Sequence, residues 1–206
     1  MSKAVFTIGH SNHSMDRFLD LLRKYEISAI ADVRSQPYSR FNPQFNREVL
    51  EKSLRSAGIS YAFLGRELGA RSEDKGCYVG GRVQYGLLAK TDLFRQGIER
   101  VMNGIEKHRI ALLCAEKEPL KCHRTILVAR QLAATGVEIQ HILENGDLES
   151  HEAALSRLLK EDKLPESDLF LSREALIADA YSRREAEIAY REKVDSDAPQ
   201  EKRLSR

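Results

Sequence analysis

The stretch RIALLCAEKEPLKCHRTILVARQLAATGVEIQHIL, residues 109–143, contains a strand, a helix and a second strand in succession. RIALLCA is a short apolar run that predicts a buried strand, and VEIQHIL predicts another. Between them, residues 122–136 have apolar side chains at helical spacing and end at Gly136, a common helix terminator. Two strands joined through a helix are expected to lie parallel in one sheet, with a right-handed crossover.

The same alternation extends toward the N-terminus. Each strand-like run is followed by an amphipathic segment, with Ser14 placed to cap the start of one helix and Gly58 to end the next. The predicted strands are 4–9, 27–33 and 59–65, the predicted helices are 14–25, 46–58 and 91–108, and residues 65–90 are predicted to be irregular. Strict alternation predicts an α/β fold with a mostly parallel sheet covered by helices on both faces.

Length and composition narrow the class of protein. A chain of 206 residues is long enough for one domain of about 150 residues and an appendage. Its apolar runs are too short to span a bilayer, and the N-terminus lacks the pattern of a signal peptide, so no membrane partner is expected. Three cysteines, an odd number, argue against a disulfide framework and predict a cytoplasmic location. The net charge of +2 is too small to indicate nucleic acid as a partner, although local basic clusters leave it open.

The C-terminal quarter differs from the rest in its density of charge. We predict an α/β domain over residues 1–150 and a charged helical extension over residues 151–206, which includes one long helix from Ser172 to about Val194 and then a disordered end. The thin apolar stripe of this helix consists of Ile177, Tyr181 and Ile188. Such a stripe predicts docking on the domain or on a second subunit, which would make a homodimer. The alternative is a solvated helix with no role.

Polar clusters follow four of the predicted strands at the point where each strand ends. They are GHSN (9–12), DVRS (32–35), GRE (65–67) and CAEKE (114–118). Because ligands of open parallel sheets bind outside the carboxyl ends of the strands, we expect these clusters to line a single cleft. The alternative is that strand ends are polar only because loops are polar.

The helix after the fourth strand is predicted to begin near Cys122, His123 and Arg124, where free backbone N–H groups and the helix dipole favour an anion or a thiolate. Several arginines lie in loops at the same edge, and guanidinium groups suit phosphate or carboxylate. The predicted ligand is therefore a small anion or a nucleotide, with Arg124 as its side-chain clamp. The candidate binding residues are His10, Ser11, Asn12, Arg34, Asn42, Arg66, Arg71 and Arg124.

Three kinds of chemistry are open at this edge. Asp32, Glu116 and His123 are candidates for acid–base catalysis, which needs neither metal nor thiolate. Cys114 and Cys122 are candidate nucleophiles, although neither is separated by five residues from an arginine, as a tyrosine-phosphatase loop requires. The spacing lacks a C-x-x-C knuckle, and adjacent ligands at 122 and 123 strain a tetrahedral site, so no metal, no stoichiometric zinc and no cofactor are expected. Three other histidines are predicted to be incidental, namely His108, His141 and His151.

Four ordered motifs, TIGHSN, DVRSQPYSRFNPQFN, FLGRELGAR and LLCAEKEPLKCHR, resemble those of the prokaryotic family catalogued as domain of unknown function 488. The resemblance covers about residues 5–143 and implies a compact α/β domain with a Rossmann-like open sheet. It implies no particular reaction. One departure is Ala70, at a position where the family more often has glycine. The positions shared with the family motifs are His10, Ser11, Asp32, Arg34, Asn42, Pro43, Arg66, Cys114, Glu116, Cys122, His123 and Arg124.

These observations leave three classes of function. We favour an enzyme, a hydrolase or a transferase, acting on an anionic substrate such as a nucleotide, a nucleic-acid component or a phosphate ester. The second class is a nucleotide- or nucleic-acid-binding module without catalysis, which the arginine- and glycine-rich residues 65–90 would also suit. The third is a cysteine-based redox site or a metal-dependent site.

Overall fold

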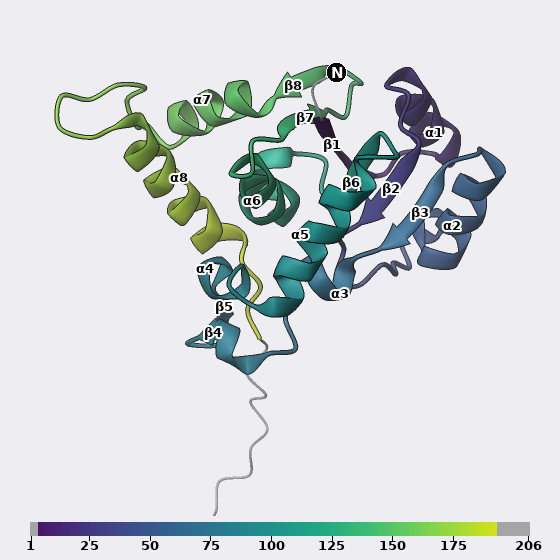
Figure 1. The fold of residues 1–206 in the computed structure, drawn as a ribbon, viewed down its shortest axis with the longest axis horizontal. Coiled ribbons are helices and arrows are strands. Elements are labelled where there is room, and N and C mark those ends of the chain that lie inside the picture. Colours follow the sequence, from purple (N-terminus) through teal and green to yellow (C-terminus); the bar gives the residue numbers. More distant parts are fainter. Residues whose placement is uncertain (1–3, 193–206) are drawn as a thin grey trace, which may run out of the picture.

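The computed structural model describes residues 4–192, and its centre is a six-stranded sheet (Figure 1). The strand order is β3-β2-β6-β1-β7-β8. Five neighbouring strands run parallel, and β8 pairs antiparallel with β7 at the edge. The strands are β1 Ala4–Gly9, β2 Ala29–Asp32, β3 Ser60–Phe63, β6 Ile110–Cys114, β7 Glu138–Ile142 and β8 Leu148–Ser150. The predicted Rossmann-like, mostly parallel sheet is confirmed.

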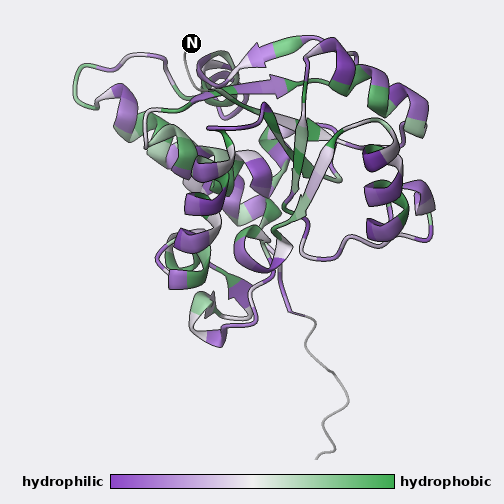
Figure 2. Ribbon diagram, turned by 45° about the vertical axis from the view of Figure 1, so that its right-hand side comes forward, coloured by the Kyte–Doolittle hydropathy of each residue, from purple (hydrophilic) through white to green (hydrophobic). Residues whose placement is uncertain are grey.

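Helices cover both faces of this sheet, as predicted. Alternate residues of β6 show it directly, because Ile110 and Leu112 belong to one apolar cluster and Ala111 and Leu113 to the other. The first cluster includes residues of α5, α6, α7 and α8, and the second includes residues of α1 and α2. In Figure 2, green runs through the central strands and purple is common on the helices around them. The helices are α1 Met15–Lys24, α2 Arg47–Ser56, α5 Asp92–Gly104, α6 Arg130–Ala133, α7 His151–Glu161 and α8 Arg173–Ile188.

Local sequence signals located three helix ends correctly, at Ser14, Gly58 and Gly136. The Ser14 hydroxyl accepts a hydrogen bond from the backbone N–H of Arg17 and so caps α1. Gly58 and Gly136 follow α2 and α6 with φ angles of 75° and 85°, which glycine adopts without steric cost.

Residues 65–90 are not irregular throughout, contrary to the prediction. They contain the short helices α3 Gly65–Leu68 and α4 Tyr85–Leu88, the 3₁₀-helix η2 Lys75–Cys77, and a hairpin of β4 Tyr78–Val79 and β5 Arg82–Val83. Elements of two to four residues are too short to display a hydrophobic period, so the sequence pattern did not reveal them.

The helix α8 docks on the domain. Its residues Leu176, Ala180 and Tyr181 are buried in the apolar cluster that also contains strand residues of the sheet. The solvated-helix alternative is therefore excluded, whereas the homodimer and the domain boundary at residue 150 stay predictions. No helix in residues 4–192 combines the length and the apolar character needed to cross a bilayer.

The end of α8 differs from the prediction. The helix stops at Ile188 because the chain turns to pair with the hairpin. The Val83 N–H donates to the Tyr190 carbonyl, and the Glu192 N–H donates to the Gly81 carbonyl. Val194, where the helix was predicted to end, and the predicted disordered end lie outside the described residues.

A chain of three buried side chains and one half-buried side chain, that of His151, links β1, β7, α7 and α8. Thr7 Oγ1 lies 2.8 Å from His141 Nδ1, and His141 Nε2 lies 3.0 Å from His151 Nδ1. His151 Nε2 lies 3.0 Å from the Tyr181 hydroxyl. Neutral imidazoles suit such a chain, since each offers one donor and one acceptor. His141 and His151 are thus part of the packing between elements, which corrects their description as incidental.

Two histidines, His10 and His151, predict a loss of stability in acid. Burial lowers the pKa of His10 and of His151 from 6.5 to about 4. Above pH 6.5 both are neutral in the folded and the unfolded chain, whereas between the two values only the unfolded chain takes up protons. The free energy of unfolding should therefore decrease as the pH is lowered from 6.5 to about 4, by on the order of 3 kcal/mol for each histidine.

Urea unfolding between about pH 7 and pH 4.5 measures this slope. His151→Gln is expected to reduce it, and His108→Ala, at an exposed position, is expected to leave it unchanged. The same slope in His151→Gln as in the parent protein would contradict the assignment.

Candidate functional site

The carboxyl ends of β1, β2, β3 and β6 lie at one edge of the sheet, because these strands are parallel and paired in register. Gly9 pairs with Cys114, and Asp32 pairs with both Leu113 and Phe63. The four polar clusters predicted from the sequence therefore begin at the same edge. They do not all line the same cleft.

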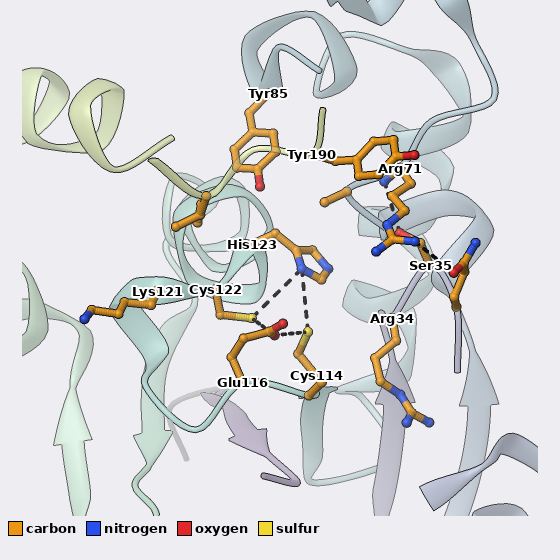
Figure 3. A pocket seen from close by; sticks show the side chains of 14 residues that line it. Arg34, Ser35, Arg71, Tyr85, Cys114, Glu116, Lys121, Cys122, His123 and Tyr190 are labelled. Carbon is orange, nitrogen blue, oxygen red and sulfur yellow. Dashed lines mark hydrogen bonds between the residues drawn. The ribbon is translucent and has the colours of Figure 1, made fainter. Parts of the chain in front are cut away.

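A cleft of about 260 Å³ opens at this edge (Figure 3). Tyr85 from α4 and Tyr190 from the segment after α8 lie across it from the sulfur atoms of Cys114 and Cys122. Residues 9–12 are not among its lining, and Arg66 lines a neighbouring cleft that shares Ser35 and Arg71. The lining residues are Arg34, Ser35, Gln36, Ala70, Arg71, Tyr85, Cys114, Ala115, Glu116, Lys121, Cys122, His123, Ile188 and Tyr190.

Two thiols, a carboxyl group and an imidazole meet at the base of the cleft, and we call Cys114, Glu116, Cys122 and His123 the thiol cluster. Both cysteine thiols donate to the same Glu116 oxygen, Oε2, at 2.9 and 3.1 Å. His123 Nδ1 lies 3.6 Å from Cys114 Sγ and 3.9 Å from Cys122 Sγ. The other ring nitrogen, Nε2, donates to the Val33 carbonyl at 2.9 Å, which leaves Nδ1 as an acceptor facing the sulfurs.

The backbone around β6 puts these four side chains together. Cys114 is the last residue of β6, and the 3₁₀-helix η3, Pro119–Lys121, turns the chain so that Cys122 returns beside it. Gly9 allows the end of β1 to approach this loop, since a Cβ there would lie 1.9 Å from the Glu116 carbonyl oxygen. A side chain at position 9 would push the loop out of place.

Arg124 opens the next helix, but it points into the protein. The first six residues of this helix form a π-helix, η4 Arg124–Ala129, which is a rare conformation found often at functional sites. The Arg124 side chain is fully buried, and its guanidinium donates to the backbone carbonyls of Glu116 and Lys117. A buried guanidinium with these partners does not contact a ligand in the cleft, which corrects its predicted role as the anion clamp.

Asp32 is also buried, and its carboxylate is already hydrogen-bonded to other side chains. Its carboxylate accepts two hydrogen bonds from the Arg34 guanidinium, at 2.8 and 2.6 Å, one from the Arg34 backbone N–H at 3.1 Å, and one from the Tyr61 hydroxyl at 2.8 Å. Arg34 Nη1 donates in addition to the Phe45 carbonyl at 2.9 Å. Asp32 is not among the cleft-lining residues, so the geometry does not suit its predicted acid–base role. Arg34 does line the cleft, but Asp32 neutralises its charge.

The predicted binding residues after β1 have other contacts. The His10 ring stacks on Phe45 at 4.4 Å between centroids, and its Nδ1 donates to the Ser11 carbonyl at 2.8 Å. The Ser11 hydroxyl donates to Asn12 Oδ1 and to Glu144. Three of the predicted binding residues, His10, Ser11 and Asn12, together with Asn42, are absent from the cleft lining.

Arg71 is the predicted binding residue whose charge faces the cleft. Its side chain is exposed, Nη1 donates to Gln36 Oε1 at 2.8 Å, and the guanidinium lies over the Tyr190 ring at 4.6 Å. Its backbone N–H donates to the Ser35 hydroxyl at 3.0 Å. Arg71 is thus held at the mouth of the cleft by three neighbours.

The thiol cluster holds groups that are too close together to ionise independently. Burial raises the pKa of Cys114, and it is also the main cause that raises the pKa of Glu116. For Cys122, burial opposes ionisation, but the hydrogen bond from Cys114 and the charge of Arg124 outweigh it and lower the pKa. For His123, burial lowers the pKa, but the contact with Cys122 outweighs it, so the net shift is upward. When both thiols are protonated they donate to Glu116, and when the cluster loses a thiol proton the negative charge is favoured on Cys122 over Cys114.

The residues that cover the cluster were missed in the sequence. Tyr85 is buried above it, and burial together with the neighbouring Cys122 raises its pKa. Tyr85 lies in a helix of four residues, which produces no periodic signal. Ile188 was recognised as part of an apolar stripe, but the surface that it covers depends on the path of α8.

The part of the chain that contains the thiol cluster matches a known protein family. The family model described as Domain of unknown function DUF488 matches residues 14–131, which include all four residues of the thiol cluster. No curated protein and no solved structure gives a significant match.

Proposed function

The chain belongs to the DUF488 family, and from this premise and the geometry of the cleft we propose that it is an enzyme acting on a small anionic substrate. The reaction class is hydrolysis or group transfer. The thiol cluster is the reacting centre, and Arg71 is the side chain that binds the anion.

The observation that carries this proposal is the meeting of two thiols, a carboxyl group and an imidazole at the base of one cleft. Burying such groups costs free energy, because each must be desolvated. A catalytic role is a reason for the protein to keep them there. Titratable groups in a cleft whose pKa values are displaced by burial and by one another are typical of catalytic sites. The thiol cluster has both properties: its titratable groups are packed together at the base of a cleft, and their pKa values are displaced by burial and by one another.

Within the cluster, Glu116 is suited to the acid–base role. Burial is the main cause that raises its pKa, and a carboxyl group with a raised pKa exchanges its proton closer to neutral pH. His123 is oriented by its bond to the Val33 carbonyl, as catalytic and metal-binding histidines commonly are. The two sulfur atoms either attack the substrate themselves or hold the group that does.

Arg71 supplies positive charge to the cleft, whereas the Lys121 side chain lines the cleft but points away from the sulfur atoms (Figure 3). Arg34 contributes little, because Asp32 neutralises it. A guanidinium has five N–H donors, and Gln36 accepts from Arg71, so further donors are available to a phosphate or carboxylate.

Arg71→Ala is expected to weaken the binding of inorganic phosphate and nucleoside monophosphates by roughly 10- to 100-fold, the effect of one lost charge-assisted hydrogen bond. Thermal unfolding of the full chain at increasing ligand concentration measures this, because a ligand that binds only the folded state raises the melting temperature.

The matched control is Arg66→Ala. It removes an exposed arginine that was predicted to bind the ligand but that lines the neighbouring cleft. We expect it to leave the affinity unchanged. Equal losses in the two variants would contradict the choice of cleft, and the absence of any stabilising anion would contradict the proposed substrate class.

A second candidate function is nucleic-acid binding without catalysis. Tyr38 and Phe41 are 58% and 78% exposed in the loop after β2, and the Arg40 guanidinium lies over the Phe41 ring. Exposed aromatic rings beside arginines are the groups on which single-stranded bases stack. Fluorescence anisotropy with a labelled single-stranded oligonucleotide tests this candidate.

A further inference from the structure

We propose that the thiol cluster binds one zinc ion, with Cys114, Cys122 and His123 as fixed ligands and Glu116 as an exchangeable fourth ligand. This inference rests on the proposed function, because it states which group the cluster supplies to the reaction. It opposes the expectation of no metal, which rested on sequence spacing alone. The side chains of all four residues point toward one another in Figure 3.

The distances fit a single ion. With Zn–S of about 2.3 Å and Zn–N of about 2.0–2.1 Å, a tetrahedral site places sulfur and nitrogen about 3.6 Å apart. His123 Nδ1 lies 3.6 and 3.9 Å from the two sulfurs, and the three donor atoms lie within 4.8 Å of one another. Adjacent positions 122 and 123 therefore do reach one centre in the folded chain.

The carboxylate is slightly too close. Glu116 Oε2 lies 2.9 and 3.1 Å from the sulfurs, closer than two ligands of one tetrahedral zinc ion, so it must withdraw by a few tenths of an ångström when an ion replaces the thiol protons. Glu116 is exposed as a residue although its carboxyl group packs against the thiols, whereas both cysteines are buried throughout. It is therefore the ligand that can move and the one that can exchange.

The donor types select a thiophilic ion. Thiolate and imidazole suit zinc, whereas magnesium and calcium prefer oxygen ligands. The bond from His123 Nε2 to the Val33 carbonyl is the outer contact that metal-binding histidines usually make, and it directs the lone pair of Nδ1 at the sulfurs.

The charges also balance. Two thiolates and one carboxylate carry three negative charges, which the buried side chains cannot hold without compensation. The Arg124 guanidinium, which donates to the backbone carbonyl of Glu116, supplies one positive charge. A divalent ion supplies the remaining two. Arg124 itself donates to backbone carbonyls, so an anionic cluster also compensates its burial.

Zinc gives the proposed hydrolysis a nucleophile. A catalytic zinc ion keeps three protein ligands and takes water in its fourth position. With Glu116 displaced, the ion would supply an activated water at its fourth position, and the Glu116 carboxylate would accept one proton from that water. Hydrolysis would break the bond between the electrophilic centre of the anionic substrate and its leaving group, and Glu116 would return the proton to the leaving group.

The first experiment uses the full chain without substitutions. It is purified from zinc-supplemented cells under reducing conditions, analysed for metals, and then stripped of metal and titrated with zinc and with cobalt(II). We expect about one zinc per chain, absorption bands of thiolate-bound tetrahedral cobalt, and proton release on binding, because the thiols must lose their protons.

Variants identify the ligands. Cys114→Ser and Cys122→Ser are each expected to weaken zinc binding by at least about 100-fold, which is the upper range for loss of an outer contact, and Glu116→Gln is expected to cost less. Cys77→Ala is the matched control, because this buried cysteine lies outside the cluster, and it should bind zinc like the parent protein.

Two outcomes overturn the inference. One is a metal-free protein that gives no cobalt bands, with Cys114 and Cys122 either both free to thiol reagents or joined in a disulfide. The other is zinc binding that survives in both cysteine variants. The proposed function fails separately, since zinc binding without any stabilising anion would refute the substrate class and leave the metal site standing.

Discussion

Replacing Arg124 by alanine is expected to lower the free energy of unfolding by about 3–5 kcal/mol. The side chain is fully buried, and its guanidinium donates to the backbone carbonyls of Glu116 and Lys117. A hydrogen bond from a charged donor contributes about 1.5–3 kcal/mol, so the two bonds account for most of this loss, and the cavity left by the side chain adds to it. Urea unfolding followed by circular dichroism measures the change.

Two further variants sharpen this prediction. Arg124→Lys keeps the charge but cannot donate to both carbonyls with the geometry of a guanidinium, so we expect an intermediate loss. Arg95→Ala removes an exposed arginine from α5 and should change the stability by less than about 0.5 kcal/mol. If Arg124→Ala were as mild as Arg95→Ala and weakened anion binding instead, the clamp role predicted from the sequence would be restored.

Replacing Asp32 by alanine is expected to cost a similar amount, about 3–5 kcal/mol. The variant leaves the nearly buried Arg34 guanidinium without its carboxylate and removes the acceptor of the Tyr61 hydroxyl. An unpaired charge in the interior is more costly than the pair was favourable. Thermal or urea unfolding detects the loss directly.

The double variant Asp32→Ala with Arg34→Leu tests the reason for that loss. Removing the unpaired guanidinium should recover part of the stability, with a coupling energy of more than about 1 kcal/mol between the two positions. A catalytic Asp32 predicts the reverse pattern, in which the single variant remains stable and loses activity while Arg34→Leu brings no recovery.

Elements with a full hydrophobic period were predictable from the sequence, and shorter ones were not. The strand β1 and the helix α1 were located within a residue or two, because an apolar run and a capping serine are local signals. The helix α4 and the hairpin were missed because they are two to four residues long. The end of α8 was placed too late because Tyr190 pairs with the hairpin, and a contact so distant along the chain has no local signal.

The thiol cluster divides in the same way. Cys114, Glu116, Cys122 and His123 were all selected as candidates from a polar join after a buried strand. The spacing of the cysteines and the histidine then argued against a shared metal site. Spacing describes separation along the chain and not distance in the folded protein. The turn of η3 and the hydrogen bond of His123 to Val33 bring the donor atoms together in space.

The sequence by itself determined the alternation of strands and helices, the parallel sheet and the edge at which its polar residues gather. These features follow from periodicity and capping, which are local properties of the chain. Only the tertiary structure decided that Arg124 and Asp32 point inward, and that Tyr85 and Tyr190 cover the cleft. The direction of a polar side chain depends on which partners the other elements bring to it, and strand order and helix packing set those partners over long separations.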